Sequence, residues 1–304
     1  MGIVSRIQRF CLHDGSGVRS TVFFQGCPMR CKWCSNPETQ SKTPVILYHT
    51  TVCIGCLKCV KACPGGNIRL DDQKLIIDRD RCIACGLCAA SCPPKAISLS
   101  GREMSATEVF DIVIRDYNYY ETSGGGITFS GGEATMQPEF LMEMMVLLKE
   151  TGIDIVLETS GYCNEEIFAR IARLCNAILF DVKHTNPEQH KNGTGIDNRQ
   201  ILRNLETAAG TCYTVIRVPL INNYNNDDIH IQSIAVLANK LSISRIELLP
   251  FHRLGTSKYE SLGLVYDYRH TPPMCNKVTQ QAADHLKQFS KSEIIIVGSS
   301  KNYQ

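Results

Sequence analysis

Cysteine constrains this chain more than any other residue type, because eleven of its sixteen cysteines lie between Cys27 and Cys92. Disulfide frameworks of such density are typical of short secreted chains. This chain has 304 residues, and it begins MGIVSRIQRF, without the apolar stretch of a signal peptide. We therefore expect a cytoplasmic protein whose cysteines ligate metal or iron–sulfur clusters rather than one another.

An internal repeat accounts for eight of these cysteines. The run C-x2-C-x2-C-x3-C-P starts at Cys53 and again at Cys82. This is the bacterial pattern for two 4Fe–4S clusters, in which the fourth cysteine of each run ligates the other cluster. The predicted ligand sets are Cys53, Cys56, Cys59 and Cys92 for one cluster, and Cys63, Cys82, Cys85 and Cys88 for the other. Four thiolates leave no iron open, which favours electron transfer, with a structural or docking role as the alternative.

Composition excludes two classes of partner. The 32 basic and 30 acidic residues are nearly balanced, so the chain lacks the basic excess typical of nucleic-acid binding. It contains no run of 18 apolar residues, which argues against a membrane span. Hydrophobic residues make up 43%, enough for a sizeable core.

Strand-like and helix-like segments alternate outside the cysteine repeat, which predicts a parallel sheet with helical crossovers. The expected strands are 18–25, 127–130, 153–158, 177–182, 213–219 and 245–250, with a further one at 294–297. The expected helices are 107–118, 138–150, 165–174, 199–208, 227–238 and 273–289. We expect an α/β fold, a partial (β/α)6 barrel with a ferredoxin-like insert. Residues 1–44 would start the barrel, 45–102 would form the insert, and 103–304 would complete the barrel.

A second cysteine motif follows the first expected strand directly. Cys27-x3-Cys31-x2-Cys34 can hold three irons of a 4Fe–4S cluster and leave the fourth open to a substrate. The carboxyl ends of parallel strands are also where α/β proteins place their active sites. A structural zinc loop with a distant fourth ligand is the alternative, although this spacing is unusual for zinc ribbons.

With Trp33 before its last cysteine, this loop resembles the signature of the radical S-adenosylmethionine (SAM) enzymes. Residues 2–38 closely resemble the N-terminus of glycyl-radical-enzyme activating enzymes. The resemblance continues through the motifs at 130–133, 181–183, 217–219 and 247–252, and it covers nearly the whole chain. The chain departs from the family at Ser16, where proline is usual, and at Cys11, where serine is common.

The resemblance implies an oxidoreductase that works anaerobically on a protein substrate. A reduced catalytic cluster would cleave SAM to methionine and a 5′-deoxyadenosyl radical, which would take a hydrogen from one glycine of a glycyl radical enzyme. The partner would be of the formate-lyase, dehydratase or lyase type, and flavodoxin or ferredoxin would donate the electron. Two alternatives are a radical SAM enzyme that acts on another peptide or a small molecule, and an iron–sulfur electron carrier.

The same resemblance places particular residues at the cofactor. The expected SAM contacts are Trp33, Cys34, Ser35, Gly131, Gly132, Glu133, Asp181, Val182, Lys183, Arg217 and His252. Glycines let backbone approach a ligand closely, and Glu133 can accept from the SAM ammonium group. Asp181 and Lys183 alternate on one strand and so share a face, where Lys183 would meet the SAM carboxylate. Arg217, in an apolar strand, would clamp the same carboxylate.

Each of these assignments has a structural alternative. The 131–133 motif is also compatible with an ordinary glycine-rich turn, and Asp181 with Lys183 as a buried ion pair. Arg217 would then extend its head to solvent at a strand edge, and His252 would be a satisfied structural histidine. We expect no acid–base residue, since the cluster and SAM carry the chemistry.

Overall fold

The computed structural model describes residues 1–12, 14–72 and 74–298. Its main element is a nine-stranded sheet with the order β13-β12-β11-β10-β9-β8-β2-β1-β7. The strands of this sheet are β1 (Gly2–Cys11), β2 (Arg19–Phe24), β7 (Arg102–Met104), β8 (Gly126–Gly131), β9 (Asp154–Thr159), β10 (Ala177–Asp181), β11 (Tyr213–Leu220), β12 (Arg245–Pro250) and β13 (Glu293–Ile296). The strands from β2 through β8 to β13 are parallel, whereas β1 is antiparallel to both β2 and β7.

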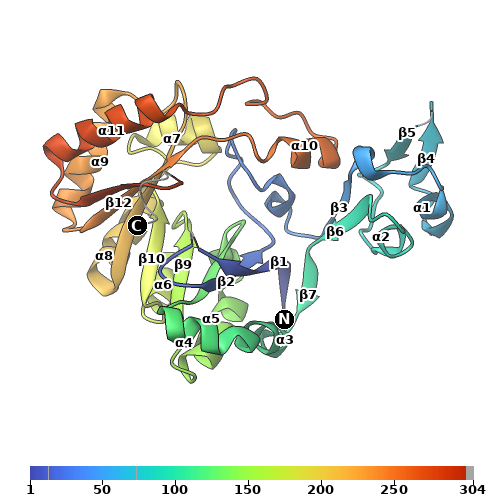
Figure 1. Cartoon of the computed structure of the whole chain (residues 1–304), viewed down its shortest axis with the longest axis horizontal. Helices are drawn as coiled ribbons and strands as arrows, with labels where there is room; N and C mark the ends of the chain where they lie inside the picture. Colours follow the sequence, from blue (N-terminus) through green and yellow to red (C-terminus); the bar gives the residue numbers. More distant parts are fainter. Residues whose placement is uncertain (13, 73, 299–304) are drawn as a thin grey trace.

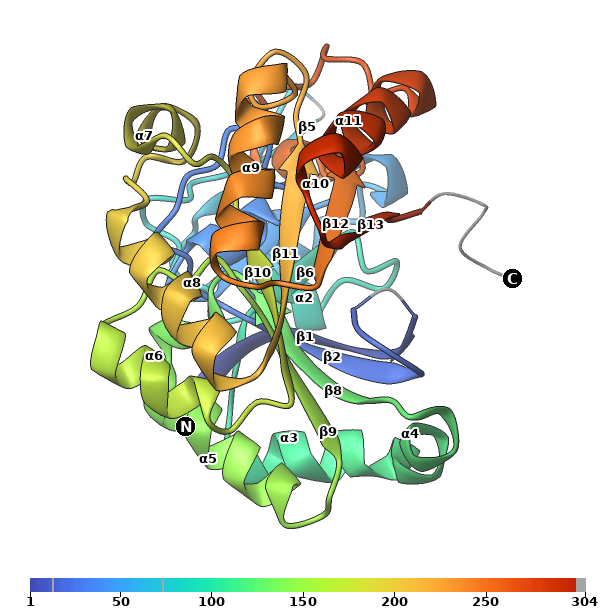
Figure 2. The same cartoon turned by 90° about the vertical axis from the view of Figure 1, so that its left-hand side faces the viewer.

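Helices alternate with the parallel strands, and most of them lie along the outer side of the curved sheet (Figure 2). They are α3 (Ala106–Val113), α4 (Tyr117–Ser123), α5 (Pro138–Lys149), α6 (Glu165–Ala172), α7 (Pro187–Thr194), α8 (Arg199–Thr211), α9 (Asp228–Lys240), α10 (Thr256–Leu262) and α11 (Asn276–Phe289). Buried apolar side chains such as Phe129, Leu141 and Phe168 fill the space between helices and sheet. This arrangement confirms the expected partial (β/α)6 barrel, and β13 is the further strand that we expected at 294–297.

The insert projects from one side of the barrel (Figure 1). It consists of β3 (Val45–Tyr48), α1 (Lys58–Ala62), β4 (Ile68–Asp71), β5 (Lys74–Ile77), α2 (Leu87–Ala90) and β6 (Ile97–Ser100). The antiparallel pair β3–β6, with Val45 opposite Ser100, brings its two ends together. It has a small core of its own, in which Ile46, Ile97 and Leu75 pack against cysteines. At Gly101, where φ is +93°, the chain turns into β7, so Arg102 belongs to the barrel sheet and not to the insert.

Our secondary-structure expectations were incomplete. We predicted neither α7 nor α10, and two further differences concern β1 and the helix over 107–118. We did not predict β1, because Arg6 and Gln8 interrupt its apolar residues on an exposed face. The expected helix over 107–118 is broken into α3, a 3-10 turn and α4. The break lies at the buried Asp116, whose carboxylate accepts a hydrogen bond from the Arg9 Nε over 2.6 Å. The pairing of β1 with β7 and the contact between Arg9 and Asp116 join segments about 100 residues apart, which local periodicity does not reveal.

Candidate active site at the carboxyl ends of the strands

The three-cysteine loop follows β2 and leaves the sheet at its carboxyl edge. Gly26 has a φ of +97°, and its N–H donates to the Thr39 carbonyl over 2.9 Å. Farther along, the N–H of Arg30 donates to the carbonyl of Thr194 at the end of α7, over 2.7 Å. These bonds fasten the loop over residues 26–34 to two separate segments of the barrel.

The three thiols of this loop are partly buried, and Cys27 and Cys31 lie against the main core. Burial raises the pKa of Cys27 and of Cys31 to about 12, and it also raises the pKa of Cys34. The ammonium of Lys183 opposes this effect at all three thiols, which places that positive charge beside the loop. Because metal binding requires thiolates, cluster assembly here must release protons.

Lys183 lies at the end of β10 in an ion pair with Asp181, and the two charged groups are 2.7 Å apart. Burial alone would lower the pKa of Lys183, but Asp181 and the nearby Cys31 raise it above its ordinary value. The two side chains therefore share a face as expected, and they form the ion pair that we gave as the structural alternative. Between them Val182 is buried, and its N–H donates to the Arg217 carbonyl over 2.8 Å.

The glycine turn after β8 lies directly against the start of the cysteine loop. The N–H of Gly132 donates to the Phe24 carbonyl, and that of Glu133 to the Gly26 carbonyl, each over 2.9 Å. A Cβ on Gly132 would lie 2.3 Å from the Gly26 oxygen, and one on Gly131 would lie 2.2 Å from the Phe24 nitrogen. Only glycines permit this contact, so the turn is fitted to the loop and is more than a flexible connection.

Glu133 is only 2% exposed, and its carboxylate is already occupied. It accepts hydrogen bonds from the hydroxyls of Thr135, Thr159 and Ser160, over 2.9, 2.7 and 2.5 Å, and from two backbone N–H groups. A carboxylate offers about four lone-pair sites. We expected this side chain to accept from an ammonium group, whereas in the structure it ties the ends of β8 and β9 together.

Arg217 is buried at 3% exposure, so our alternative of a head in solvent is wrong for this residue. Its Nη1 lies 2.9 Å from Glu158, and its Nε lies 2.9 Å from Glu247. Glu247 also pairs with Arg245 over 3.1 Å. The Arg217 guanidinium, which we expected to bind the SAM carboxylate, therefore already forms ion pairs with two carboxylates of the protein itself.

The remaining expected contacts surround the loop in different ways. Trp33 is buried, with its ring centroid 4.6 Å from that of Tyr224 and 6.3 Å from that of Tyr268. Ser35 is half-buried against Gly255, where a Cβ would lie 2.9 Å from the Ser35 Cα. His252 is exposed after β12, and its Nδ1 accepts from a backbone N–H over 3.3 Å.

Our sequence reasoning missed the tyrosines near this loop. Tyr259 and Tyr266 stack with ring centroids 4.4 Å apart. Burial raises the pKa of both, and the charge of Cys34 adds to the effect. Tyr224 is close enough to Cys31 for that thiol to raise its pKa as well, after burial as the main cause. No spacing in the sequence separates these tyrosines from ordinary core aromatics.

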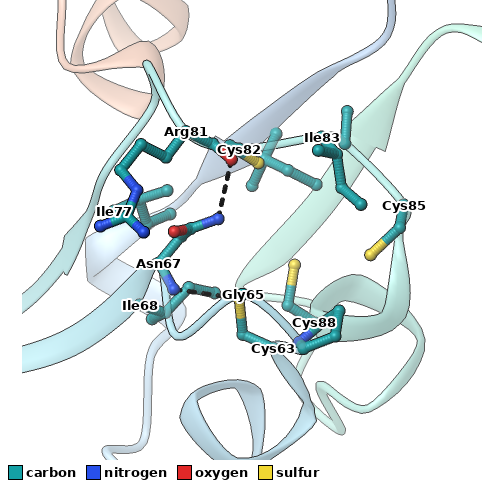
Figure 3. Close-up of a pocket in the computed structure, with 13 residues that line it drawn as sticks. Cys63, Gly65, Asn67, Ile68, Ile77, Arg81, Cys82, Ile83, Cys85 and Cys88 are labelled. Carbon is teal, nitrogen blue, oxygen red and sulfur yellow. Dashed lines mark hydrogen bonds between the residues drawn. The ribbon is translucent and has the colours of Figure 1, made fainter.

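The insert groups its eight cysteines around two cavities. A cavity of about 170 Å³ is lined by the Cys82 set, which is Cys63, Cys82, Cys85 and Cys88. Figure 3 shows sulfurs of this set pointing into the shared space, with the Asn67 N–H donating to the Cys63 sulfur over 3.3 Å. A tighter cavity of about 10 Å³ is lined by the Cys53 set, which is Cys53, Cys56, Cys59 and Cys92. Each cavity thus combines three cysteines of one run with the fourth cysteine of the other.

The donor chemistry of the three cysteine groups fits iron–sulfur clusters. All sixteen cysteines are free thiols. Within the described residues, no three His, Cys, Asp or Glu side chains lie close enough to hold one metal ion. A 4Fe–4S cluster binds each thiolate on a different iron, so its ligands stand farther apart than those of a single ion.

Comparison with known proteins identifies the family. Residues 79–231 match the radical SAM superfamily, and residues 52–96 match a 4Fe-4S dicluster domain. The choline trimethylamine-lyase activating enzyme of Oleidesulfovibrio alaskensis is 36% identical over 295 residues, which cover 94% of this chain and 95% of that protein. This chain belongs to the glycyl-radical-enzyme activating enzymes of the radical SAM superfamily.

A second curated relative supports this placement, and a solved structure shares the fold. The 4-hydroxyphenylacetate decarboxylase activating enzyme of Clostridium scatologenes is 38% identical, over 95% of this chain and 94% of that protein. Streptococcus suis SuiB, in a crystal structure with S-adenosylmethionine, shares the fold at a TM-score of 0.51 and 10% identity, over 66% of this chain and 45% of that protein. Among the described residues of this activating enzyme, no helix is long and apolar enough to cross a membrane.

Proposed function

We propose that this activating enzyme binds a 4Fe–4S cluster through Cys27, Cys31 and Cys34, and binds SAM at the open iron. When bound, the cluster and SAM supply the reductive cleavage that yields a 5′-deoxyadenosyl radical, which takes a hydrogen from a glycine of a partner glycyl radical enzyme. The single observation that carries the proposal is the fit of the Gly131–Gly132 turn against the backbone that leads into Cys27. This contact brings a ligand-binding turn and an incomplete cluster site to one edge of the sheet.

The chain's own groups have distinct tasks in this proposal. The charge of Lys183 acts on all three thiols, so we assign it the SAM carboxylate. Because the Glu133 carboxylate is occupied, backbone carbonyls of the turn are the acceptors for the SAM ammonium group. Arg217 acts as a positioning residue that holds Glu158 and Glu247 beneath the site.

We further propose that residues 45–100 form an electron-transfer domain with two 4Fe–4S clusters, one on each of the two cysteine sets. The enzyme would then hold three clusters and take its electron from flavodoxin or ferredoxin. The curated relatives named above activate a lyase and a decarboxylase at similar identity. We therefore assign the partner to this broad group of glycyl radical enzymes rather than to one reaction.

Anaerobic reconstitution tests the proposal. Iron and sulfide would be counted per chain, the protein reduced with dithionite, and 5′-deoxyadenosine measured after addition of SAM. We expect about twelve irons per chain and SAM cleavage, followed by a glycyl radical signal with a candidate partner. About eight irons without cleavage would mean that the Cys27 loop holds no catalytic cluster, and the chain would be an electron carrier on a barrel scaffold.

A further inference from the structure

A cavity of about 480 Å³ lies between the insert and the cysteine loop of the barrel. Arg30 and Pro37 line it from the barrel side, and Arg79 and Cys82 line it from the insert side. Cys82 also lines the 170 Å³ cavity of its own set. The Cys82 set is therefore the inner of the two sets, next to the loop that carries Cys27.

Polar contacts hold the insert in this position. The Arg79 guanidinium donates to the carbonyl of Ile46 in β3 over 2.5 Å and to that of Ser261 in α10 over 2.7 Å. On the same helix, the Lys258 ammonium lies 2.6 Å from the Glu38 carboxylate, just after the cysteine loop. Helix α10 thus joins the insert to the cysteine loop, which favours a fixed path between the inner set and the catalytic loop.

The Cys53 set occupies the far end of the insert. Helix α1, which carries Cys59, lies farther from the barrel than α2, which carries Cys88 (Figure 1). Cys56 is exposed, and the adjacent Ile54 is 68% exposed. A single exposed apolar side chain is ordinary on a protein surface, so the charge of this face decides which kind of partner it fits.

Charge is distributed unevenly over the insert. Lys58 and Lys61 of α1 and Lys95 near the Cys53 cavity are all exposed. Residues 49–70 and 81–101 contain no aspartate or glutamate, and the acidic residues of the insert are confined to 71–80, on the β4–β5 hairpin and the turn after it. The face formed by α1 and its flanking loops is therefore basic, and it complements an acidic partner.

We propose that this outer face, formed by Ile54, Cys56, Lys58, Lys61 and Lys95, is the docking surface for an acidic one-electron carrier protein. The inference rests on the proposed function and adds a direction to it. One electron leaves the reduced carrier and enters the protein at the Cys53 set, then passes by way of the Cys82 set toward the Cys27 loop. The carrier is oxidised by one electron, the enzyme is reduced by one, and no bond breaks and no proton moves.

The Cys82 set is the alternative point at which an electron from the carrier protein would enter. Cys85 is exposed, and Ile83 beside it is 77% exposed. Of the two arginines that precede these residues, Arg81 is exposed, whereas Arg79 is half-buried and donates to Ile46 and Ser261. The outer face carries three exposed lysines. Arg81 therefore serves as the matched comparator within the same domain.

The test uses reconstituted enzyme with all clusters in place and reduced flavodoxin as the probe, with flavodoxin oxidation followed by stopped-flow absorbance. We expect Lys58→Glu combined with Lys61→Glu to slow electron transfer at least about tenfold at low ionic strength, because steering by charge contributes factors of this size. The difference should shrink between about 20 mM and about 500 mM salt as the charges are screened. Arg81→Glu, and Lys277→Glu with Lys291→Glu on the barrel, should change the rate less than about twofold.

Dithionite separates this inference from the proposed function. If dithionite supports SAM cleavage equally in wild type and in the Lys58/Lys61 variant, both proteins are intact, and a slower reaction with flavodoxin locates the docking surface. If Arg81→Glu slows electron transfer from flavodoxin more than the Lys58/Lys61 variant does, the outer face is not the point of electron entry. The same conclusion follows if flavodoxin does not reduce the wild type at any salt concentration. If dithionite yields no 5′-deoxyadenosine from wild type, the proposed function itself fails.

Discussion

The ammonium of Lys183 lies 2.7 Å from the carboxylate of Asp181, and this ion pair lies beside Cys31 at the edge of the barrel. The pair holds a positive charge where the three thiols converge. A SAM carboxylate bound there would find a cation already in place, with its desolvation offset by Asp181.

Removal of this cation should weaken SAM binding. A hydrogen bond to a charged group contributes about 1.5–3 kcal/mol, so we expect Lys183→Met to raise the Kd for SAM about 10- to 100-fold. Equilibrium binding to reconstituted protein measures the effect, and Lys183→Arg, which keeps the charge, should lose less. An unchanged Kd at full iron content would assign Lys183 to structure alone.

Replacement of Arg217 should lower the stability of the fold, and any effect on SAM binding should be secondary. Arg217→Met leaves Glu158 and Glu247 without their shared cation, and breaking such buried pairs costs about 3–5 kcal/mol. Denaturant unfolding of the reconstituted protein would reveal this loss, and adding Glu247→Gln should recover part of it. If Arg217→Met unfolds like the wild type but binds SAM poorly, Arg217 is a ligand clamp instead.

The glycine turn should not tolerate a single methyl group. In Gly132→Ala the new Cβ would meet the Gly26 oxygen at 2.3 Å, so the turn must separate from the cysteine loop. We expect a loss of SAM affinity of at least about tenfold and a destabilisation of about 1–3 kcal/mol. Gly210→Ala is the matched control, since α8 has open space there and alanine should stabilise the helix by up to about 1 kcal/mol.

The two cavities of the insert predict which cysteine variants behave alike. Cys92→Ala should lose the same cluster as Cys56→Ala, and Cys63→Ala the same cluster as Cys85→Ala, with about four irons lost in each case. Electron paramagnetic resonance of the reduced proteins distinguishes the remaining cluster. If Cys92→Ala instead matched Cys85→Ala, the fourth cysteine of each run would serve its own run.

Buried histidines should make the enzyme sensitive to acid. Burial lowers the pKa of His230 to about 3 and that of His190 to about 4, with the nearby His184 adding to the effect on both. Because the unfolded chain takes up these protons near pH 6.5, the stability is complete above that pH and falls as the pH decreases. Each histidine contributes a slope of up to about 1.4 kcal/mol per pH unit.

The difference between wild type and His230→Gln isolates this effect from acid loss of the clusters. Denaturant midpoints measured between about pH 7 and about pH 5 should converge as the pH falls. Parallel curves over this range would show that His230 does not titrate on unfolding.

The local sequence pattern was sufficient to predict much of the fold and the cysteine sets of this enzyme. The repeat that starts at Cys53 and Cys82 predicts two exchanged ligand sets, because the spacing itself carries the ligand geometry. The strand at 245–250 was predicted with its observed bounds, since an apolar run between two helices has little freedom in an α/β chain. The Cys27 motif predicts a site at the carboxyl edge of the sheet because it directly follows a parallel strand.

Tertiary structure alone decided what each polar group near that site contacts. Whether Glu133 is free or occupied depends on hydroxyls of Thr135, Thr159 and Ser160, two of them at the end of the next strand. Whether Arg217 faces a ligand or two carboxylates depends on β9 and β12, which flank it only once the sheet has formed. A sequence specifies which groups a chain carries and their local spacing, whereas burial and pairing arise from segments that meet only on folding.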